Sequence, residues 1–237
     1  MEGLSVLVLA AGEGKRMCSG YPKVLHPLCG HPMLYYILES ALAFTGQIHV
    51  VIGHGAPQVR ETMGSSWNYI LQEKQLGTGH ALLQALPCLP HTGRLLVLCG
   101  DTPLLETKHL QKMLDLHISG GATVMTAQVP DPTGYGRIIR DPQGQVEAIV
   151  EEGDAIPEQK AINEINTGAY CFDLEHLTRF LPMLNENNAQ REYYLTDLVS
   201  LFKTSGHSVQ AYCLDDYRVG LGVNDRRQLA EATALMR

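Results

Sequence analysis

The sequence predicts an α/β fold with a Rossmann-like, mostly parallel mixed sheet that carries helices on both faces. Strand-like and helix-like segments alternate through the first half of the chain, as they do in parallel sheets joined by right-handed crossovers. The first strand-like segment, residues 4–10, is apolar almost throughout, which is typical of a strand buried on both faces. With 237 residues, 45% of them hydrophobic and 18% charged, the chain can build a full core.

The first half contains a regular succession of strands and helices. The expected strands are residues 4–10, 48–52, 67–71, 94–99 and 122–129. The expected helices are residues 32–44, 56–63, 79–86 and 107–117. Pro32 fits the first turn of its helix, where a missing N–H costs nothing, and Pro87 ends the third helix. Each of the first four strands is therefore followed by a helix.

The second half does not begin with the same alternation of strands and helices. The turn residues Asp141 to Gly144, with Pro142 between them, favour a hairpin between residues 136–140 and 145–150. Strands are then expected at 165–172 and 209–214, and helices at 174–184, 195–205 and 225–236. We expect Asp173 to cap the first of these helices and Gly206 to end the second. No repeat or linker interrupts the chain, so residues 1–237 are expected to form a single domain.

Charge and hydropathy exclude some classes of partner. The net charge is −7, with 25 acidic residues against 18 Lys and Arg, and non-specific nucleic-acid binding needs a broad basic surface instead. A local basic cluster can still hold a phosphorylated small molecule. No apolar run approaches the ~20 residues that span a bilayer, and the first residues do not form a basic leader. We therefore expect a cytoplasmic protein with neither nucleic acid nor membrane as a partner.

Cysteine and histidine spacing gives little sign of a metal centre. The six cysteines are at positions 18, 29, 88, 99, 171 and 213, and no two form a Cys-x-x-Cys pair. Several follow apolar runs, so we expect buried free thiols in place of disulfides. The ten histidines do not match a ligand spacing either and are expected to be structural.

Three loops follow the carboxyl ends of expected strands, where ligands bind in open parallel sheets. They are residues 11–22, 72–79 and 100–105. Because these ends meet at one edge of the sheet, we expect the three loops to form one site.

The first loop contains Gly12-Glu13-Gly14-Lys15-Arg16. It lacks the earlier glycine and the following Ser or Thr of a Walker A loop, and the third glycine of a dinucleotide-binding loop. Its glycines still allow backbone amides to approach a ligand, while Lys15, Arg16 and the later Lys23 add positive charge. This composition favours phosphate binding over a merely solvated basic loop.

The other two loops carry polar groups with two possible roles. Gln72 offers an amide that can both donate and accept at the edge of a base, and Thr78 sits where a helix begins. Thr78 is equally well explained as an ordinary helix cap. Asp101, one step past a buried strand, suits a hard cation such as Mg²⁺. Taken alone, that segment is better explained by an Asp that caps the turn before Pro103.

Together, these segments and four later ones resemble the sugar-phosphate nucleotidylyltransferases. The matching residues are Leu9-Ala10-Ala11-Gly12-x-Gly14-x-Arg16-Met17 with Pro22-Lys23, then Gln72-x-x-Gln75-Leu76-Gly77-Thr78-Gly79-His80-Ala81, and further segments at 131–138, 164–168, 187–197 and 222–226. The ordered set is similar to the uridylyltransferase domain of the bifunctional bacterial enzymes that make UDP-N-acetylglucosamine. The likeness covers essentially the whole chain and implies the nucleotide-diphospho-sugar transferase type of fold.

The resemblance implies a role for each matching position. Nucleotide binding falls to Leu9, Ala10, Ala11, Gly12, Gln72, Gly77 and Thr78, in a part of the chain up to about residue 121. Sugar binding is assigned to Gly136, Glu151, Asn166, Tyr194, Thr196 and Asn224, all in the part from about 122 to 237. The catalytic residues are Arg16, Lys23 and Asp101, and Asp101 and Asn224 hold Mg²⁺.

The implied reaction transfers UMP from UTP to N-acetylglucosamine 1-phosphate and releases pyrophosphate, in support of bacterial cell-wall synthesis. The attacking phosphate is already an anion, so a general base is not needed. Glu151 and Glu152 are not expected to form a catalytic pair, because neighbouring residues of a strand point to opposite faces. Two alternatives stay open: the same chemistry on another base or sugar, and a catalytically silent module that binds nucleotide sugars.

The sequence departs from the family pattern at two positions, and it does not include the β-helix segment of the bifunctional relatives. Arg191 stands where relatives commonly carry glycine or another small residue, and Cys99 where an aromatic residue is frequent. The bifunctional relatives continue into a left-handed β-helix made of hexapeptide repeats, which these 237 residues lack. Acetyltransferase activity is therefore not expected from these residues. The trimer that rests on that domain stays open, and with it the oligomeric state.

Overall fold

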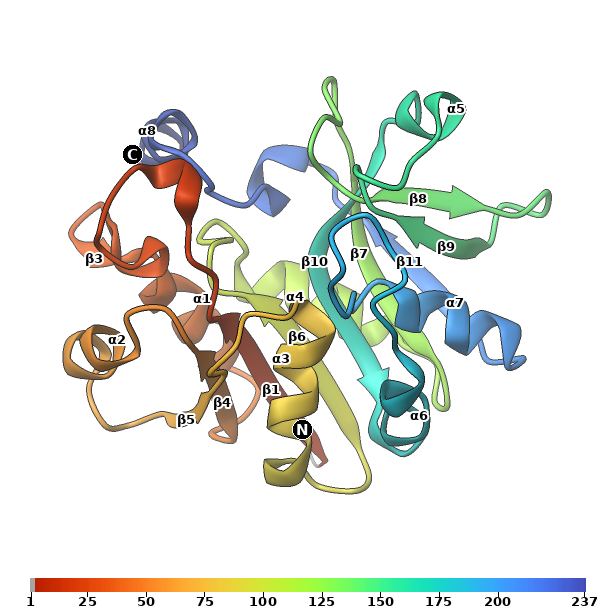
Figure 1. Cartoon of the computed structure of the whole chain (residues 1–237), viewed down its shortest axis with the longest axis horizontal. Coiled ribbons are helices and arrows are strands. Elements are labelled where there is room, and N and C mark those ends of the chain that lie inside the picture. The colour runs from red at the N-terminus through yellow and green to blue at the C-terminus, as the bar shows by residue number, and fades with distance from the viewer. Residues whose placement is uncertain (1–2) are drawn as a thin grey trace.

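The computed structural model describes residues 3–237 and places a nine-stranded sheet at the centre of the protein (Figure 1). Its strands are β1 (Leu4–Ala10), β4 (Ile48–Ile52), β5 (Asn68–Leu71), β6 (Arg94–Cys99), β7 (Ala122–Gln128), β8 (Arg137–Arg140), β9 (Val146–Val150), β10 (Glu164–Asp173) and β11 (Val209–Cys213). Seven of them follow the order β11-β7-β10-β6-β1-β4-β5, and the β8–β9 hairpin is attached to β10. The predicted strands are thus confirmed, with small shifts at their ends.

One strand of the seven runs against the others. β1 pairs in parallel with β4 and β6, β4 with β5, and β7 with β11. β10 is antiparallel to both of its neighbours, β6 and β7. The expected mostly parallel mixed sheet is therefore confirmed, and β10 is the strand that joins its two parallel portions.

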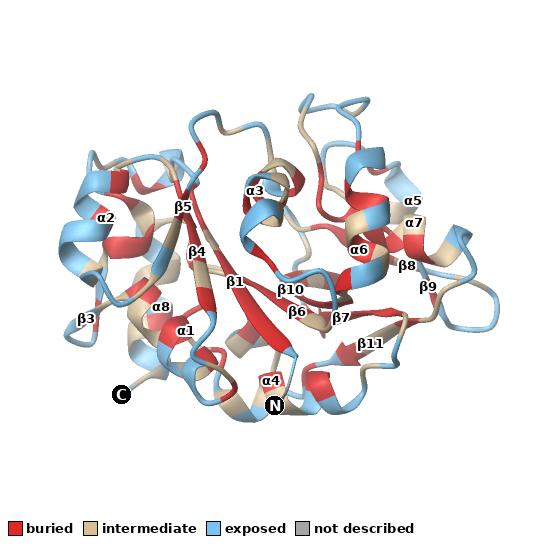
Figure 2. Ribbon diagram, turned by 90° about the horizontal axis from the view of Figure 1, so that it is seen from below, coloured by how far each residue is buried: buried red, intermediate tan, exposed pale blue. Residues whose placement is uncertain are grey.

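Helices cover both faces of the sheet (Figure 2). They are α1 (Met33–Leu42), α2 (Ala56–Met63), α3 (Thr78–Ala85), α4 (Thr107–Asp115), α5 (Pro157–Lys160), α6 (Leu174–Phe180), α7 (Asp197–Thr204) and α8 (Arg226–Leu235). The core on one face contains side chains of α1, α2 and α4, and the core on the other face contains those of α3, α6 and α7. In β1, Val6 and Val8 belong to the first core and Leu7 to the second, so alternate side chains are buried on opposite faces.

A few local expectations are wrong. The helix expected at 174–184 is α-helical only to Phe180, because Pro182 lies in a tighter 3₁₀ turn that follows. Asp173 does not cap that helix, since its carboxylate accepts a hydrogen bond from the Gly120 amide at 3.0 Å. The short hairpin of β2 (Pro27–Leu28) and β3 (His31–Pro32) was not predicted, and neither was α5.

The cysteines are free, as expected, but most are not buried. Cys171 is buried and Cys99 partly so, whereas the other four are exposed. Those four lie outside the buried central strands, three of them in loops or short 3₁₀ turns and Cys213 at the end of the edge strand β11. Within residues 3–237, no helix combines the length and the apolar character that a bilayer crossing requires.

Candidate active site

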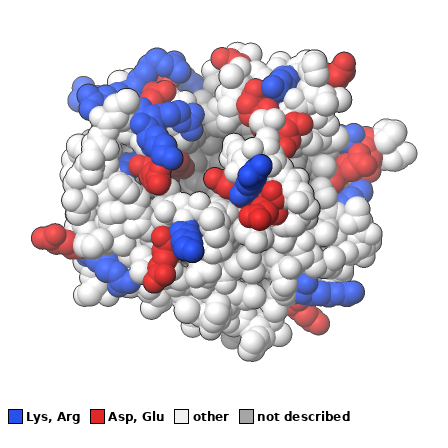
Figure 3. All heavy atoms as spheres, in the orientation of Figure 1, with Lys and Arg blue, Asp and Glu red and all other residues white. Residues whose placement is uncertain are grey.

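A cavity of about 450 Å³ opens where the chain leaves β1, β5 and β6. Figure 3 shows a hollow on this face with basic and acidic side chains along its rim. The cavity is lined by residues of all three predicted loops and of adjoining segments, and the predicted site residues in its lining are Leu9, Ala10, Ala11, Gly12, Arg16, Lys23, Gln72, Gly77, Thr78, Asp101 and Asn224. The prediction that the three strand-end loops form one site is therefore confirmed.

The glycine-rich loop leaves room for the side chain of Lys23, which follows it in the chain. Gly14 has a φ of +64°, in the left-handed region that favours glycine, and Met17 is almost completely buried beneath the loop. A Cβ added to Gly14 would lie 2.5 Å from the Lys23 Cβ, so any side chain there would displace Lys23. Arg16 is exposed at the cavity wall and has no ion-pair or hydrogen-bond partner anywhere in the described chain. Within residues 3–237, the loop and the turn after it thus present Lys23 as a fixed cation and Arg16 as a free one, while Lys15 pairs with Glu13 at 2.8 Å.

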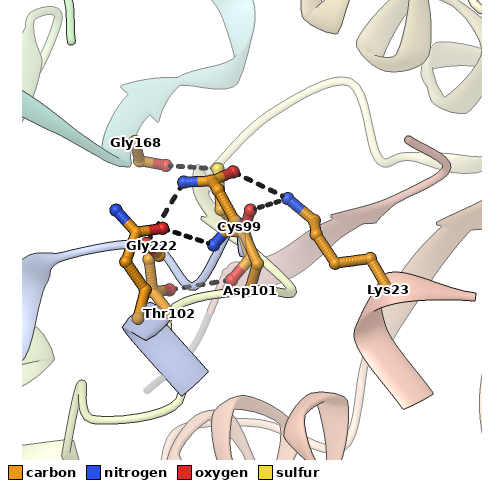
Figure 4. Close-up of polar contacts among 8 residues, drawn as sticks. Lys23, Cys99, Asp101, Thr102, Gly168 and Gly222 are labelled. Carbon is orange, nitrogen blue, oxygen red and sulfur yellow. Dashed lines mark hydrogen bonds and ion pairs between the residues drawn. The ribbon is translucent and has the colours of Figure 1, made fainter. Parts of the chain in front are cut away.

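Lys23, Asp101 and Asn224 meet in the lining of the cavity. Figure 4 shows Lys23 reaching Asp101. The Lys23 Nζ donates to Asp101 Oδ2 and, at 3.0 Å, to Asn224 Oδ1. The Lys23 and Asp101 side chains are only 13% and 19% exposed, so this contact is shielded from bulk water. The Asp101 carboxylate caps no turn in this arrangement, which removes the alternative explanation of that residue.

The Asp101–Asn224 pair could hold a hard cation. Both offer oxygen atoms, one from a carboxylate and one from an amide, and both oxygens already face a single cation, the Lys23 ammonium. Mg²⁺ is commonly held by one or two such protein groups together with substrate phosphates. Asn224 is brought here by the backbone, because Val223 N–H donates to the Asp101 carbonyl at 2.8 Å.

The second loop holds Gln72 and Thr78 in defined positions. Gln72 is 3% exposed, and its amide nitrogen donates to the Gly77 carbonyl at 3.1 Å and contacts His80 Nδ1 at 2.9 Å. The Thr78 hydroxyl accepts from the Leu195 amide at 3.1 Å and does not cap its own helix. The helix-cap interpretation of Thr78 is therefore wrong.

Apart from Asn224, the predicted sugar-side residues lie outside the lining of this cavity and are hydrogen-bonded to one another or to neighbours. Thr196 Oγ1 donates to Glu151 Oε1 at 3.0 Å, and Tyr194 donates to Asp154 at 3.2 Å. The Asn166 amide donates to Tyr170 at 2.6 Å, while its oxygen accepts from the Gly168 amide at 3.0 Å.

Glu151 sits at the centre of this group. Burial raises its pKa, and the Thr196 hydrogen bond opposes that shift only in part. A Cβ on Gly136 would approach Glu151 Oε2 to 3.3 Å, so glycine keeps the carboxylate accessible.

Glu152 has a different partner from Glu151, although both residues follow the end of β9 at Val150 and do not lie on a strand as expected. Its carboxylate accepts from Arg137 Nη2 at 2.6 Å and from the Gly134 amide at 3.1 Å. The hydrogen bond from Arg137 lowers the pKa of Glu152. Arg137 is only 1% exposed and was not singled out from the sequence, although it lies in one of the matching segments. A basic residue inside the apolar pattern of β8 was the available signal.

Loop 184–196 connects the sugar side to the nucleotide side. The Tyr193 carbonyl accepts from the Gly79 amide at 2.7 Å, and the Tyr193 amide donates to Leu76 at 2.8 Å. A Cβ at Gly77 or Gly79 would come within 2.6 or 2.8 Å of that carbonyl, so only glycine permits this close contact.

The two residues that depart from the family pattern lie in different places. Arg191 belongs to loop 184–196 and has a φ of +54°, which explains structurally why glycine suits its position. Cys99 points toward Gly168, with its thiol 3.4 Å from the carbonyl oxygen (Figure 4). Burial raises the pKa of this thiol to about 12, so it is protonated at neutral pH.

Comparison with known proteins agrees with this architecture. A family model described as nucleotidyl transferase matches residues 5–222. The chain is 48% identical over 236 residues to the bifunctional protein GlmU of Geobacillus thermodenitrificans, covering 98% of this chain and 51% of that protein. It is 50% identical over 238 residues to the bifunctional protein GlmU of Pelotomaculum thermopropionicum, covering 99% and 52%. The chain thus spans about half the length of these curated relatives.

A solved structure supports the fold at lower sequence similarity. It is a candidate glucose-1-phosphate thymidylyltransferase from Bacillus anthracis, in complex with a sucrose. The two chains align with a TM-score of 0.75 at 20% identity, covering 99% of this chain and 95% of the other. At that identity the likeness establishes the arrangement of strands and helices.

Proposed function

This chain belongs to the nucleotidyl transferase family. We propose that it transfers UMP from UTP to N-acetylglucosamine 1-phosphate, with release of pyrophosphate. The observation that carries the proposal is the convergence of Lys23, Asp101 and Asn224 in the lining of a cavity that Gln72 also lines. The bifunctional relatives support the choice of substrates, because the part of them that this chain matches is continuous and nearly half identical to it.

In this proposal Asp101 and Asn224 hold Mg²⁺. Their oxygens fit it, since they already share one cation, and carboxylate and amide oxygens are the ligands that Mg²⁺ prefers. When bound, the metal ion would neutralise charge on phosphate oxygens. Asp101 would contribute the negative charge of the site, and the backbone contact between Val223 and Asp101 would keep Asn224 in place.

The chain's own cations supply the remaining electrostatic stabilisation. Arg16, which has no partner in residues 3–237, is free to contact the triphosphate, and Lys23 is close enough to the same space to stabilise the transferring phosphate. The attacking oxygen belongs to a phosphate that is already ionised, so proton removal is unnecessary. Catalysis then consists of placing two anions in line and reducing their repulsion.

We assign the base and the sugar to two different parts of the chain. The backbone from Leu9 to Gly12 and the Gln72 side chain would hold the base, in the part up to about residue 121. The sugar would lie against residues of the part from about 122 to 237. These are Gly136, Glu151, Asn166, Tyr194 and Thr196. We place this activity in a single domain, and its cytoplasmic location stays a prediction.

The test is pyrophosphate release by the purified chain, with Mg²⁺, from UTP, CTP, ATP, GTP and dTTP combined with a panel of sugar 1-phosphates. We expect the highest kcat/KM for UTP with N-acetylglucosamine 1-phosphate. Preference for another pair would keep the chemistry and change the substrates. If no pair released pyrophosphate although UTP bound, the chain would be a silent nucleotide-sugar binding module.

A further inference from the structure

We propose that His80 determines base specificity by fixing the orientation of the Gln72 side-chain amide. This inference rests on the proposed function, because it assumes that Gln72 faces the base of the nucleotide. His80 lies in the first turn of α3 and is not part of the cavity lining, so it would act through Gln72 as a positioning residue.

The Gln72 amide has only one orientation that satisfies its surroundings. Its nitrogen lies 3.1 Å from the Gly77 carbonyl oxygen, which can only accept a hydrogen bond. The group facing Gly77 must therefore be the NH₂ and not the oxygen. The same nitrogen lies 2.9 Å from His80 Nδ1, so its second proton is directed at the imidazole. Two acceptors thus hold both protons of the amide.

This arrangement also fixes the tautomer of His80. If Nδ1 accepts from Gln72, the proton of the neutral ring is on Nε2. Nε2 lies 3.3 Å from the side-chain amide of Gln84, an exposed contact in which the Gln84 oxygen can rotate to receive that proton. The imidazole therefore has a consistent set of partners as a neutral ring with an acceptor turned toward Gln72.

The consequence is that Gln72 offers an acceptor to the cavity. Its Oε1 has no hydrogen-bond partner in the described chain, and the side chain lines the cavity while being 3% exposed. Uracil carries an N–H donor at position 3, which matches this oxygen. Cytosine carries an unprotonated acceptor at the same position, which would face Oε1 with both groups desolvated and unpaired. The fixed orientation of the Gln72 amide therefore favours uracil over cytosine.

The experiment compares UTP with CTP in wild type and three variants at His80. His80→Leu removes the acceptor, whereas His80→Asn keeps an oxygen near the position of Nδ1. His80→Lys presents a donor to the amide NH₂. We measure kcat and KM for both nucleotides, direct binding of UTP and CTP by calorimetry, and Tm to establish folding.

We expect His80→Leu to lower the UTP-to-CTP ratio of kcat/KM about tenfold, mainly through the KM for UTP, because one hydrogen bond to the amide is lost. His80→Lys should lower it at least as much, and His80→Asn should stay within about threefold of wild type. If His80→Leu does not fold, the contrast between the Asn and Lys variants carries the test.

Two outcomes would overturn the inference. One is an unchanged ratio in His80→Leu and His80→Lys, and the other is an equal loss in His80→Asn. Failure of the proposed function looks different, because the wild type itself would then neither use nor prefer UTP. A wild type that prefers UTP with variants that keep the preference would remove only the role of His80.

Discussion

The nucleotide side and the sugar side of this site are built in different ways. On the nucleotide side, loops after parallel strands surround an open cavity and present groups that have no hydrogen-bond partner within residues 3–237, such as Arg16 and the Gln72 oxygen. On the sugar side, Glu151, Asn166 and Tyr194 are hydrogen-bonded to other residues of the protein. The nucleotide side therefore offers some groups directly to a ligand, whereas the sugar-side residues, like Lys23 and Asp101, must exchange internal hydrogen bonds for bonds to a ligand.

The largest expected effect is a loss of kcat when Asp101, the acidic residue of the nucleotide side, is replaced. Asp101→Ala should lower kcat about 10²–10³-fold, because it removes a proposed metal ligand and the partner of Lys23. Circular dichroism and Tm should stay near wild type, since the side chain is partly exposed and its backbone contacts remain. The control is Asp115→Ala at the end of α4, remote from the cavity. A wild-type kcat at saturating Mg²⁺ would remove Asp101 from the metal site.

The next effect concerns the cation on the same side. Lys23→Met should lower kcat about 10²-fold, because the transferring phosphate loses a fixed positive charge in a shielded place. The matched control is Lys108→Met, which removes the same charge from an exposed ion pair on α4 and should change kcat less than about twofold. Steady-state pyrophosphate release measures both. Equal rates for the two variants would show that Lys23 does not contact the phosphates.

A smaller effect probes the sugar side through the partly buried carboxylate of Glu151. Glu151→Gln should raise the KM for N-acetylglucosamine 1-phosphate about tenfold and leave the KM for UTP unchanged. A parallel rise in both values would mean that the two sides are not separate.

The same variant has a pH signature in stability. The folded-state pKa of Glu151 is raised above its ordinary value of 4.5, so this carboxyl contributes stability below that pH and loses it as pH rises through the folded pKa. Glu151→Gln should therefore raise Tm at pH 7, with the gain disappearing near pH 4. A gain independent of pH would assign the effect to packing instead of charge.

The smallest expected effect is on the loop that joins the two sides. Arg191→Gly should raise stability by about 1 kcal/mol, or about 2–4 °C in Tm, because a φ of +54° is unfavourable for a residue with a Cβ. Arg191→Ala is the control, since alanine keeps that strain and should give no gain. A similar gain in both variants would trace the effect to the arginine side chain.

The sequence was most informative where a local pattern implies a position in space. The apolar run of residues 4–10 predicted a central buried strand, and the loops after parallel strands predicted a shared cavity. Both depend on short stretches of chain and on a general rule about parallel sheets. Asn224 was different, because only its motif marked it, and a backbone hydrogen bond from Val223 brings it to Asp101.

Other features depend on contacts that a local pattern does not encode. The apolar pattern of a buried strand does not indicate whether the strand runs parallel or antiparallel to its neighbours. The antiparallel orientation of β10 could therefore not be inferred from residues 165–172. The burial of Arg137 requires the carboxylate of Glu152, which comes from another segment. The roles of Thr78 and His80 likewise appear only when Leu195 and Gln72 are in place.

The position of β10 has a mechanical consequence. Hinge motion requires residues that can change φ and ψ without losing hydrogen bonds. β10 pairs with β6 over Tyr170–Asp173 on one edge and with β7 on the other, so backbone hydrogen bonds connect the two sides of the site, with one irregularity between Asn166 and Tyr170. Rotation of one side against the other would break these backbone hydrogen bonds. Adjustment of fit between the two substrates is therefore left mainly to the flanking loops, and loop 184–196 touches both sides.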